Sequence, residues 1–478
     1  MTQIEWNSVL LPWRFENVRQ LLEQVESQTS IPSDQLNLLC CFFLSYPLAF
    51  LQSQISSVQI KHYINIFIGI TMAQFVYNIA WLHSLFTSIV TYYILKWLPI
   101  RYSSIVAFLF NMEYLAFLHI IRMMNDYNGW KMDCTTSQMI IVIKLTSFAI
   151  NFYDGKVKTT TEMDENDSLQ LSRMKTVWKA MAITEFPSLV EYLGYVFCFT
   201  TFFAGPCFEY RIYLDAIRGS RFNFDGKRVA VSLLRPALCK CAIGVFFMVL
   251  VALFGSYSNV SAPFHQELSF NIRTIRVVVA LFITRCKYYC AWKLAEGATI
   301  LTGAGFEGFA SDGAIEGFDG VNNIDIIGFE TAQNIRVLVR SWNRGTQMWL
   351  ERYVYSRTNT LFLTYLCSAV WHGFYPGYYI FFLSLPLVTT INRRVRRHIR
   401  PLFDGNKENS HLIKRVYDCV GVVCTLCTIN YLAISFVVLS WEESLRSYQS
   451  LYFFGHIAIA FTYLFLAMFP FESKSKEL

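Results

Sequence analysis

The chain has 478 residues, of which 54% are hydrophobic, 17% aromatic and only 16% charged. Soluble domains carry roughly 25% charged residues, so this composition excludes an ordinary soluble protein and indicates lipid as the solvent. The net charge of +7 is small for this length, and the basic residues lie between apolar runs, so nothing here favours nucleic-acid binding.

Apolar segments recur over most of the chain. Residues 1–34 precede them and carry charges such as Glu5, Arg14 and Glu23, so we expect an amphipathic or loop segment there and no signal peptide. Several segments reach the roughly 20 residues needed to cross hydrocarbon, and shorter ones are expected to be tilted or re-entrant. They predict a polytopic, all-α membrane protein with about 9–12 transmembrane or re-entrant helices, in one domain over residues 35–470. The segments are 37–54, 63–82, 84–99, 103–121, 138–152, 188–204, 229–255, 273–302, 359–389, 416–440 and 449–470.

Basic residues cluster in polar stretches between these segments, and the positive-inside rule places such stretches in the cytosol. The stretch 256–271 has no Lys or Arg, so we expect it on the lumenal side. A single helix over 359–389 would then have both ends in the cytosol, which one crossing does not allow. The basic stretches are 155–179, 211–228, 336–357 and 393–415.

A break at His372 resolves this conflict. The residues that follow it, Gly-Phe-Tyr-Pro-Gly, interrupt a helix and let backbone line a cavity. We expect a helix over 358–371, a turn from His372 to Gly377 and a second helix over 378–387, with His372 deep in the membrane and nearer the lumenal face. An ionisable side chain at that depth is a functional candidate. The alternative is a histidine satisfied by a neighbouring helix.

The last residues, 471–478, are predicted to form a cytosolic tail. Lys474 and Lys476 are the fifth and third residues from the end, which resembles the di-lysine signal for retrieval to the endoplasmic reticulum. The alternative is a solvated charged tail. We therefore expect a protein of the endoplasmic reticulum membrane with a cytosolic C-terminus.

No metal or permanently bound cofactor is expected. The thirteen cysteines lie mostly in apolar segments, where Cys behaves as a small hydrophobe. Cys424 and Cys427 have the spacing of metal ligands but lie in mid-helix without a second ligand pair. Neither a Walker loop nor a dinucleotide-binding fingerprint is present.

A second polar candidate, Asn343, lies in the sequence Arg-Ser-Trp-Asn-Arg at residues 340–344. Trp342, Trp349 and Tyr353 recur at helical and near-helical spacing, with arginines between them. This pattern predicts a helix lying at the cytosolic interface.

Together the two stretches resemble the paired signature of the membrane-bound O-acyltransferase family, an Asn in an aromatic, Arg-flanked helix and then Trp-His-Gly in an apolar run. The longer form over residues 371–378 resembles the lysophospholipid acyltransferase branch, and residues 292–309 look closest to lysophosphatidylcholine acyltransferases. One departure is Phe318-Asp319, where the branch usually has Trp-Asp. Further matches are Tyr431 with Phe436, Tyr448 with Tyr452, Phe453 and His456, Asn151–Gly155 and Pro187–Glu191.

The resemblance implies acyl transfer from acyl-CoA, as a co-substrate, to a glycerol hydroxyl in an intramembrane catalytic cavity between the helices. His372 would be the general base, because imidazole has an ordinary pKa of about 6.5. Asn343 would polarise the thioester carbonyl through its amide N–H. The motif singles out no Ser or Cys nucleophile, so direct transfer is expected.

The remaining candidate site residues are predicted to bind substrate. Arginines would pair with the phosphates of coenzyme A, although headgroup-facing arginines are an equal alternative for any one of them. Glu296 either lines the lipid cavity or is a packed polar residue. The candidates are Arg340, Arg344, Arg352, Trp342, Trp371, Tyr378, Glu296, Tyr448, Tyr452 and His456.

We therefore expect an enzyme that re-acylates lysophospholipids, with lysophosphatidylcholine at its 2-position as the first choice of acceptor. Its partners would be acyl-CoA, the lysophospholipid and membrane lipids, without nucleic acid, and a homo-oligomer stays open. The alternatives are another acceptor (lysophosphatidylinositol, lysophosphatidylserine, a sterol or a protein) or a lipid transporter with His372 on its path.

Overall fold

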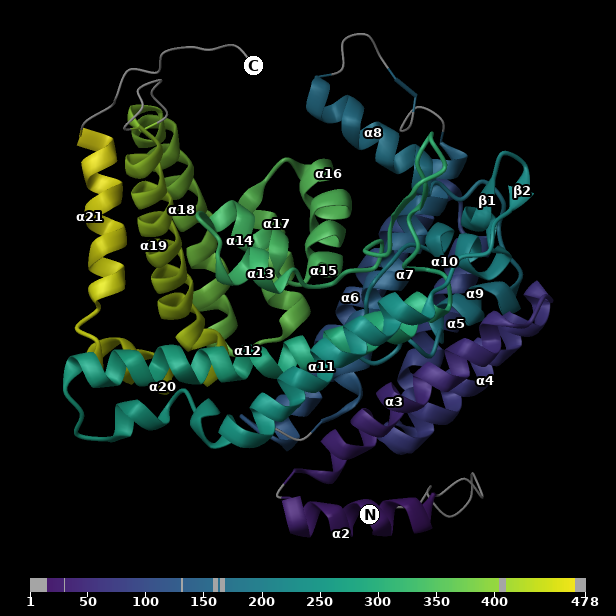
Figure 1. The fold of residues 1–478 in the computed structure, drawn as a ribbon, viewed down its shortest axis with the longest axis horizontal. Helices are drawn as coiled ribbons and strands as arrows, with labels where there is room; N and C mark the ends of the chain where they lie inside the picture. The colour runs from purple at the N-terminus through teal and green to yellow at the C-terminus, as the bar shows by residue number, and fades with distance from the viewer. Residues whose placement is uncertain are drawn as a thin grey trace. The chain divides into compact units, whose positions relative to one another are not determined.

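The computed structural model describes residues 15–29, 31–129, 132–157, 162–163, 168–403 and 410–468 (Figure 1). Helices account for nearly all of the regular structure there. The strands that the described part contains form two short antiparallel ribbons, in which β1 (Asn223–Phe224) pairs with β2 (Lys227–Arg228) and β3 (Gly308–Phe309) pairs with β4 (Ile315–Gly317). The predicted all-α fold is confirmed.

The chain packs as two compact units. The first unit comprises Met1–Phe246 and Cys290–Asn323, and the second comprises Phe247–Tyr289 and Ile324–Leu478. Two long helices, α11 (Leu234–Phe254) and α12 (Phe270–Leu301), contribute residues to both. The domain limits at residues 35 and 470 stay predictions.

Helices of the first unit start where the sequence provides caps. The Ser188 hydroxyl accepts from the Glu191 backbone N–H while the Glu191 carboxylate accepts from the Ser188 backbone N–H, a capping box that begins α9. Glu191 is therefore a capping residue in this fold. The elements of this unit are α2 (Glu16–Thr29), α3 (Ser33–Ser53), α4 (Val58–Tyr77), η1 (Asn78–Trp81), α5 (Leu82–Trp97), α6 (Ile100–Asn125), α7 (Cys134–Lys156), α8 (Leu169–Met181), α9 (Leu189–Val196), α10 (Tyr210–Arg218), η3 (Ser220–Phe222) and the two ribbons.

Several helices are suited to hydrocarbon. Within the described ranges, five helices are long and apolar enough to cross a bilayer, or six if the pair Trp441–Ser450 and Phe454–Met468, bent by 78°, is one span. Large apolar side chains such as Phe67, Leu253 and Phe461 are exposed on them, as expected for surfaces that face lipid. These helices support a polytopic membrane protein, and the larger number of transmembrane or re-entrant helices stays a prediction.

The second unit contains the predicted break. The apolar run 359–389 forms α17 and α18, which end and begin on either side of residues 373–375, so the turn predicted from His372 to Gly377 is confirmed. The elements of this unit, besides its parts of α11 and α12, are η4 (Gly255–Ser258), η5 (Ala262–His265), α13 (Ile326–Glu330), α14 (Ile335–Ser341), α15 (Arg344–Trp349), the π-helix η6 (Leu350–Tyr355), α16 (Ser356–Thr358), α17 (Leu361–His372), α18 (Pro376–Ile399), η7 (Arg400–Leu402), α19 (Ser410–Val438), α20 (Trp441–Ser450) and α21 (Phe454–Met468).

Three long helices of this unit, α18, α19 and α21, stand side by side (Figure 1). The end of α18, the start of α19 and the end of α21 lie at one end of this bundle. The start of α18 lies at the other end, where the Gly377 N–H donates to the Leu439 carbonyl at 2.7 Å. His372, directly before this start, is therefore at the end of the bundle opposite to the basic C-terminal end of α18. Its place nearer the lumenal face stays a prediction.

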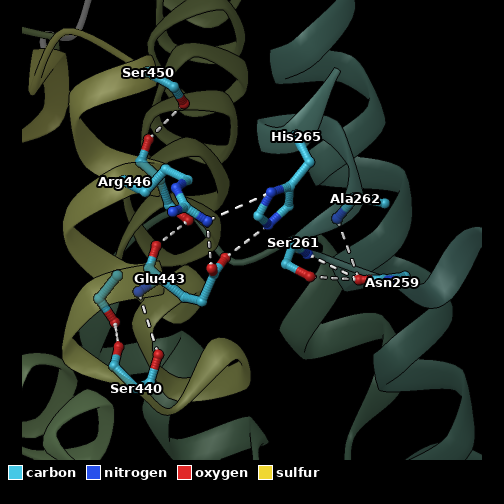
Figure 2. Close-up of polar contacts among 10 residues, drawn as sticks. Asn259, Ser261, Ala262, His265, Ser440, Glu443, Arg446 and Ser450 are labelled. Atoms are coloured by element: carbon cyan, nitrogen blue, oxygen red, sulfur yellow. Dashed lines mark hydrogen bonds and ion pairs between the residues drawn. The ribbon is translucent and has the colours of Figure 1, made fainter.

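The segment before α12 closes that second end (Figure 2). His265 Nε2 lies 3.0 Å from Glu443 Oε2, and Arg446 Nη1 donates to Glu443 Oε1 at 2.7 Å. Next to it, Asn259 Oδ1 accepts from the Ser261 backbone and hydroxyl, which shapes the turn that leads into η5. Residues 256–271 thus lie at the end of the second unit opposite to the end of α18 and the start of α19.

Candidate active site

His372 is the last residue of α17, and the glycine that follows it ends the helix. Gly373 has φ 121°, a backbone conformation that residues with a side chain rarely adopt. Its N–H donates to the carbonyls of Ala369 and Val370. Pro376 then occupies the first turn of α18, where its missing N–H costs nothing. The order His-Gly followed by Pro therefore places the imidazole at a helix end.

Gly377 lets α18 approach the end of α19 closely. A Cβ atom at this position would lie 2.0 Å from the Ser435 carbonyl oxygen and 2.8 Å from that of Leu439. The same approach allows the bond from the Gly377 N–H to Leu439. The second glycine of the motif is thus required by packing between helices.

Four aromatic rings surround His372, and we call Trp371, Tyr378, Phe382 and Phe436 the aromatic cage. The centroid of the imidazole lies 4.7 Å from that of Trp371, 5.4 Å from Tyr378 and 5.2 Å from Phe436. The Phe382 ring stacks on it at 5.0 Å with an interplanar angle of 26°. The imidazole is half-buried, so the cage can shield it from bulk water while it exchanges a proton.

Phe382 is a member of the cage that the sequence analysis missed. It follows Tyr378 by four residues, so the two side chains lie on one face of α18. That spacing was the signal that could have identified it. Trp371 and Tyr378, predicted to bind substrate, are both in contact with His372, and their contact with substrate stays a prediction.

Asn343 lies at a corner between two helices, so the helix predicted around it does not run through it and begins only at Arg344. The place of this helix at the cytosolic interface stays a prediction. It adopts the left-handed conformation with φ 41° and ψ 56° between α14 and α15. The preceding Trp342 is extended because its indole packs among Tyr288, Tyr289 and Phe329, with centroids 5.7, 6.0 and 5.0 Å away. Asn tolerates this backbone better than most residues.

The side-chain amide of Asn343 is not used to cap α15. Only its backbone carbonyl takes part in the helix start, where it accepts from the Gln347 N–H at 2.9 Å. Asn before a helix usually accepts a hydrogen bond from the first turn through its side chain, and Asn343 does not. An N–H group held in this way could donate to a developing oxyanion.

A tryptophan pair connects the corner to His372. Trp349, at the end of α15, and Trp371 are both buried, and their ring centroids are 6.2 Å apart. Because η6 packs along α17, residues 349–371 form a hairpin with its turn near residue 360. Both tryptophans lie at its open end, roughly 15 Å from the turn. The end of α15 therefore lies beside the end of α17 that carries His372.

The basic side chains of the stretch 336–357 are all arginines, which are suited to binding an anionic co-substrate. Arg340 and Glu351 form an exposed pair at 3.7 Å, which is worth little and can be exchanged for a phosphate. Arg352 Nη2 lies 3.7 Å from Met348 Sδ. No group of three or more His, Cys, Asp or Glu in the described ranges could hold a metal ion.

Tyr448 and His456 belong to a second aromatic cluster together with Tyr431. The Tyr431 hydroxyl and His456 Nδ1 are 2.6 Å apart, and the rings of Tyr448 and His456 are 4.7 Å apart. Tyr452 does not join them, since its side chain is 71% exposed beside Phe270. Because Tyr431 and Phe436 both lie on α19, this helix links the cluster to the aromatic cage.

Glu296 lies in the first unit as a packed polar residue. Its carboxylate is fully buried, 2.6 Å from Lys293 Nζ and 3.8 Å from Lys240 Nζ, and accepts from the Asn323 N–H at 2.7 Å. Lys240 Nζ also contacts Asp319 Oδ1 at 2.7 Å. A role of Glu296 in substrate binding stays a prediction.

The network also accounts for the departure at Phe318-Asp319. The acid pairs with Lys240, and the Phe318 ring packs on Phe306 with centroids 5.7 Å apart. The element therefore ties the loop after α12 to α11 within the first unit, and a phenylalanine suffices for the aromatic contact.

Comparison with known proteins supports the resemblance seen in the stretches around Asn343 and His372. The model of the membrane-bound O-acyltransferase family matches residues 123–434, which include Asn343 and His372. The lysophospholipid acyltransferase of Schizosaccharomyces pombe is 32% identical over 94% of this chain and 89% of its own length. That of Saccharomyces cerevisiae is 31% identical over 94% and 72%, and the human membrane-bound glycerophospholipid O-acyltransferase 2 is 29% identical over 91% and 85%. The resemblance is confirmed, and the chain belongs to the membrane-bound O-acyltransferase family, as a polytopic membrane acyltransferase.

Proposed function

We propose that this enzyme transfers an acyl group from acyl-CoA to the free hydroxyl of a lysophospholipid, with lysophosphatidylcholine, acylated at its 2-position, as the preferred acceptor. The relatives' names support a lysophospholipid acceptor. The observation that carries the proposal is the position of His372, a titratable group at a helix end within the aromatic cage, beside the end of α15, the helix that follows Asn343.

In this reaction His372 removes the proton of the glycerol hydroxyl as its oxygen attacks the thioester carbonyl. Asn343 donates its amide N–H to the carbonyl oxygen, which becomes negatively charged in the tetrahedral intermediate. When the C–S bond breaks, the imidazolium returns the proton to the departing sulfur, so the products are phospholipid and CoA thiol. The cage keeps water from competing for the thioester.

The two substrates differ in solubility and would enter separately. Coenzyme A is anionic, and Arg340, Arg344 and Arg352 would bind its phosphates from the cytosol. The lysolipid would reach His372 from the membrane. This arrangement suits two candidate residues carried on different segments.

The same proposal includes the orientation in the endoplasmic reticulum membrane. The α18–α19 connection and the C-terminus would be cytosolic and residues 256–271 lumenal. In support, the C-terminal ends of α18 and α21 lie opposite to residues 256–271 in the second unit, and the last turns of α18 are basic. The tail with Lys474 and Lys476 lies outside the described residues, so the retrieval signal stays a prediction. Asn166 starts a glycosylation motif in the 155–179 stretch and also lies outside the described residues. That it carries no glycan, because this stretch is cytosolic, likewise stays a prediction.

The acceptor is tested with purified protein, an unsaturated acyl-CoA and an equimolar mixture of lysolipids, with products identified by mass. We expect phosphatidylcholine to dominate, together with one CoA thiol released per product. Dominant phosphatidylinositol or an acylated sterol would refute the acceptor but not the enzyme class. Lipid movement without any thiol release would instead indicate a transporter.

Replacing His372 by Ala should leave a folded, membrane-inserted protein whose turnover falls by about 10²–10⁴, because the hydroxyl is no longer deprotonated. Thiol release and thermal unfolding in detergent are measured side by side. His265→Ala, in the same unit but outside the candidate site, is the matched control and should keep its turnover. Wild-type turnover in His372→Ala would disprove the assignment.

Replacing Asn343 by Asp or Gly should lower kcat by about 10²–10³ and change KM for the lysolipid less, because the amide bond strengthens in the transition state. Both replacements adopt the left-handed backbone readily, so they separate the amide from the corner. Recovery of kcat in Asn343→Gly would show that only the backbone conformation matters.

For orientation, single cysteines at residue 257 or 403 are labelled with an impermeant maleimide in sealed microsomes, after serine replaces the exposed native cysteines. We expect labelling at 403 without permeabilisation and at 257 only after it. A glycan on Asn166, or lumenal labelling at 403, would overturn the proposed orientation and the assignment of the basic stretches to the cytosol. The exposed cysteines are Cys40, Cys239, Cys419, Cys424 and Cys427.

A further inference from the structure

A half-buried ion pair lies beside the Asn343 corner and has no part in the mechanism above. Arg285, on α12, donates from Nε to Glu330 Oε1 at 2.9 Å and from Nη2 to Glu330 Oε2 at 3.1 Å. Its third donor, Nη1, reaches Asn430 Oδ1 on α19 at 2.8 Å. The Tyr289 hydroxyl donates to Glu330 Oε1 at 2.7 Å. We call Arg285 and Glu330 the fork; it connects α12, α13 and α19.

The fork is in contact with the rings that hold Trp342. The Arg285 guanidinium lies over the Phe329 ring, 5.5 Å from its centroid, and Phe329 packs on the Trp342 indole. Tyr289, whose hydroxyl binds Glu330, also packs on Trp342. Two of the three rings around this indole are thus fixed by groups of the fork.

A backbone contact ties the other end of α13 to the same corner. The Asp325 N–H, at the start of α13, donates to the Ser341 carbonyl at 3.0 Å, and Trp342 follows Ser341 directly. α13 spans only residues 326–330. One short helix is therefore held by the fork at one end and by the corner at the other, so a shift of Glu330 moves both supports of Trp342.

Geometry, more than stability, is what such a pair can supply. An ion pair that is partly removed from water is weak evidence for stability, because desolvation offsets part of its attraction. A bidentate arginine–carboxylate contact, in contrast, fixes the orientation of both partners. A residue such as Asn343 keeps a strained left-handed backbone only where its surroundings determine the conformation.

We propose that Arg285 and Glu330 are positioning residues, which hold Trp342 and thereby fix Asn343 in the geometry that polarises the thioester. The inference rests on the proposed acyl transfer for its kinetic part. It predicts that the fork acts on kcat through Asn343 and not on substrate affinity.

The test uses the full-length protein in detergent with lysophosphatidylcholine and an unsaturated acyl-CoA. Arg285→Lys keeps the charge but cannot form the bidentate contact. Tyr289→Phe removes one hydrogen bond to Glu330 and keeps the ring that packs on Trp342. Arg276→Lys, at an exposed position of the same helix, is the matched control.

In Arg285→Lys we expect kcat to fall by about 10- to 100-fold with KM nearly unchanged, and in Tyr289→Phe a smaller fall in the same direction. Hydrogen–deuterium exchange over residues 341–349 should rise in both and stay at the wild-type level in Arg276→Lys. In the Asn343→Asp background, Arg285→Lys should lower kcat far less than it does alone, because both changes remove the same contribution.

Three results would overturn the proposal. The first is hydrogen–deuterium exchange over residues 341–349 that stays unchanged in Tyr289→Phe. The second is a wild-type kcat in a variant whose exchange is raised. The third is an equal fall of kcat on Arg285→Lys in the wild-type and the Asn343→Asp backgrounds. Should Arg285→Lys fail to fold, Tyr289→Phe alone decides. A wild-type protein that releases no CoA thiol would refute the proposed function, while the exchange measurement would still show whether the fork holds the corner.

Discussion

A polar group that is removed from water needs a partner inside the protein, and this constraint explains how several charged side chains between the helices are arranged. Lys144 is fully buried and donates to the carbonyls of Tyr195 and Val196 and to the Thr201 hydroxyl. Glu296 is paired with two lysines, and Arg285 is paired with Glu330 and Asn430. Such charges join helices, so an ionisable residue in an apolar run is by itself weak evidence for catalysis here. His372 differs because four aromatic rings surround it at a helix end.

The break at His372 could be predicted because its causes are local. Gly373 needs its positive φ, and Pro376 is suited to a first helical turn, so the sequence contains both the stop and the new start. The length of the following helix could not be predicted in the same way. α18 continues to Ile399, through the arginines assigned to a loop, because the apolar pattern ends before the helix does.

The corner at Asn343 has causes that are distant in sequence, so the break between α14 and α15 could not be predicted. The spacing of Trp342, Trp349 and Tyr353 is helical, and nothing nearby in the sequence disfavours a helix. The rings that draw Trp342 out of the helix belong to α12 and α13, and the fork that fixes them joins residues 45 positions apart. The departure at Phe318-Asp319 is similar, since Lys240, the partner of the acid, lies 79 positions away.

The corner also changes how the two candidate catalytic residues relate. In the observed hairpin Trp349 packs on Trp371, so the end of α15 lies beside the end of α17 that carries His372. The backbone groups that the break between α14 and α15 frees find partners, since the Asp325 N–H donates to the Ser341 carbonyl and the Gln347 N–H donates to the Asn343 carbonyl. The fork fixes two of the rings around Trp342, so the contacts on which the Asn343 corner depends come from α12, α13 and α19 and not from the sequence of the corner itself.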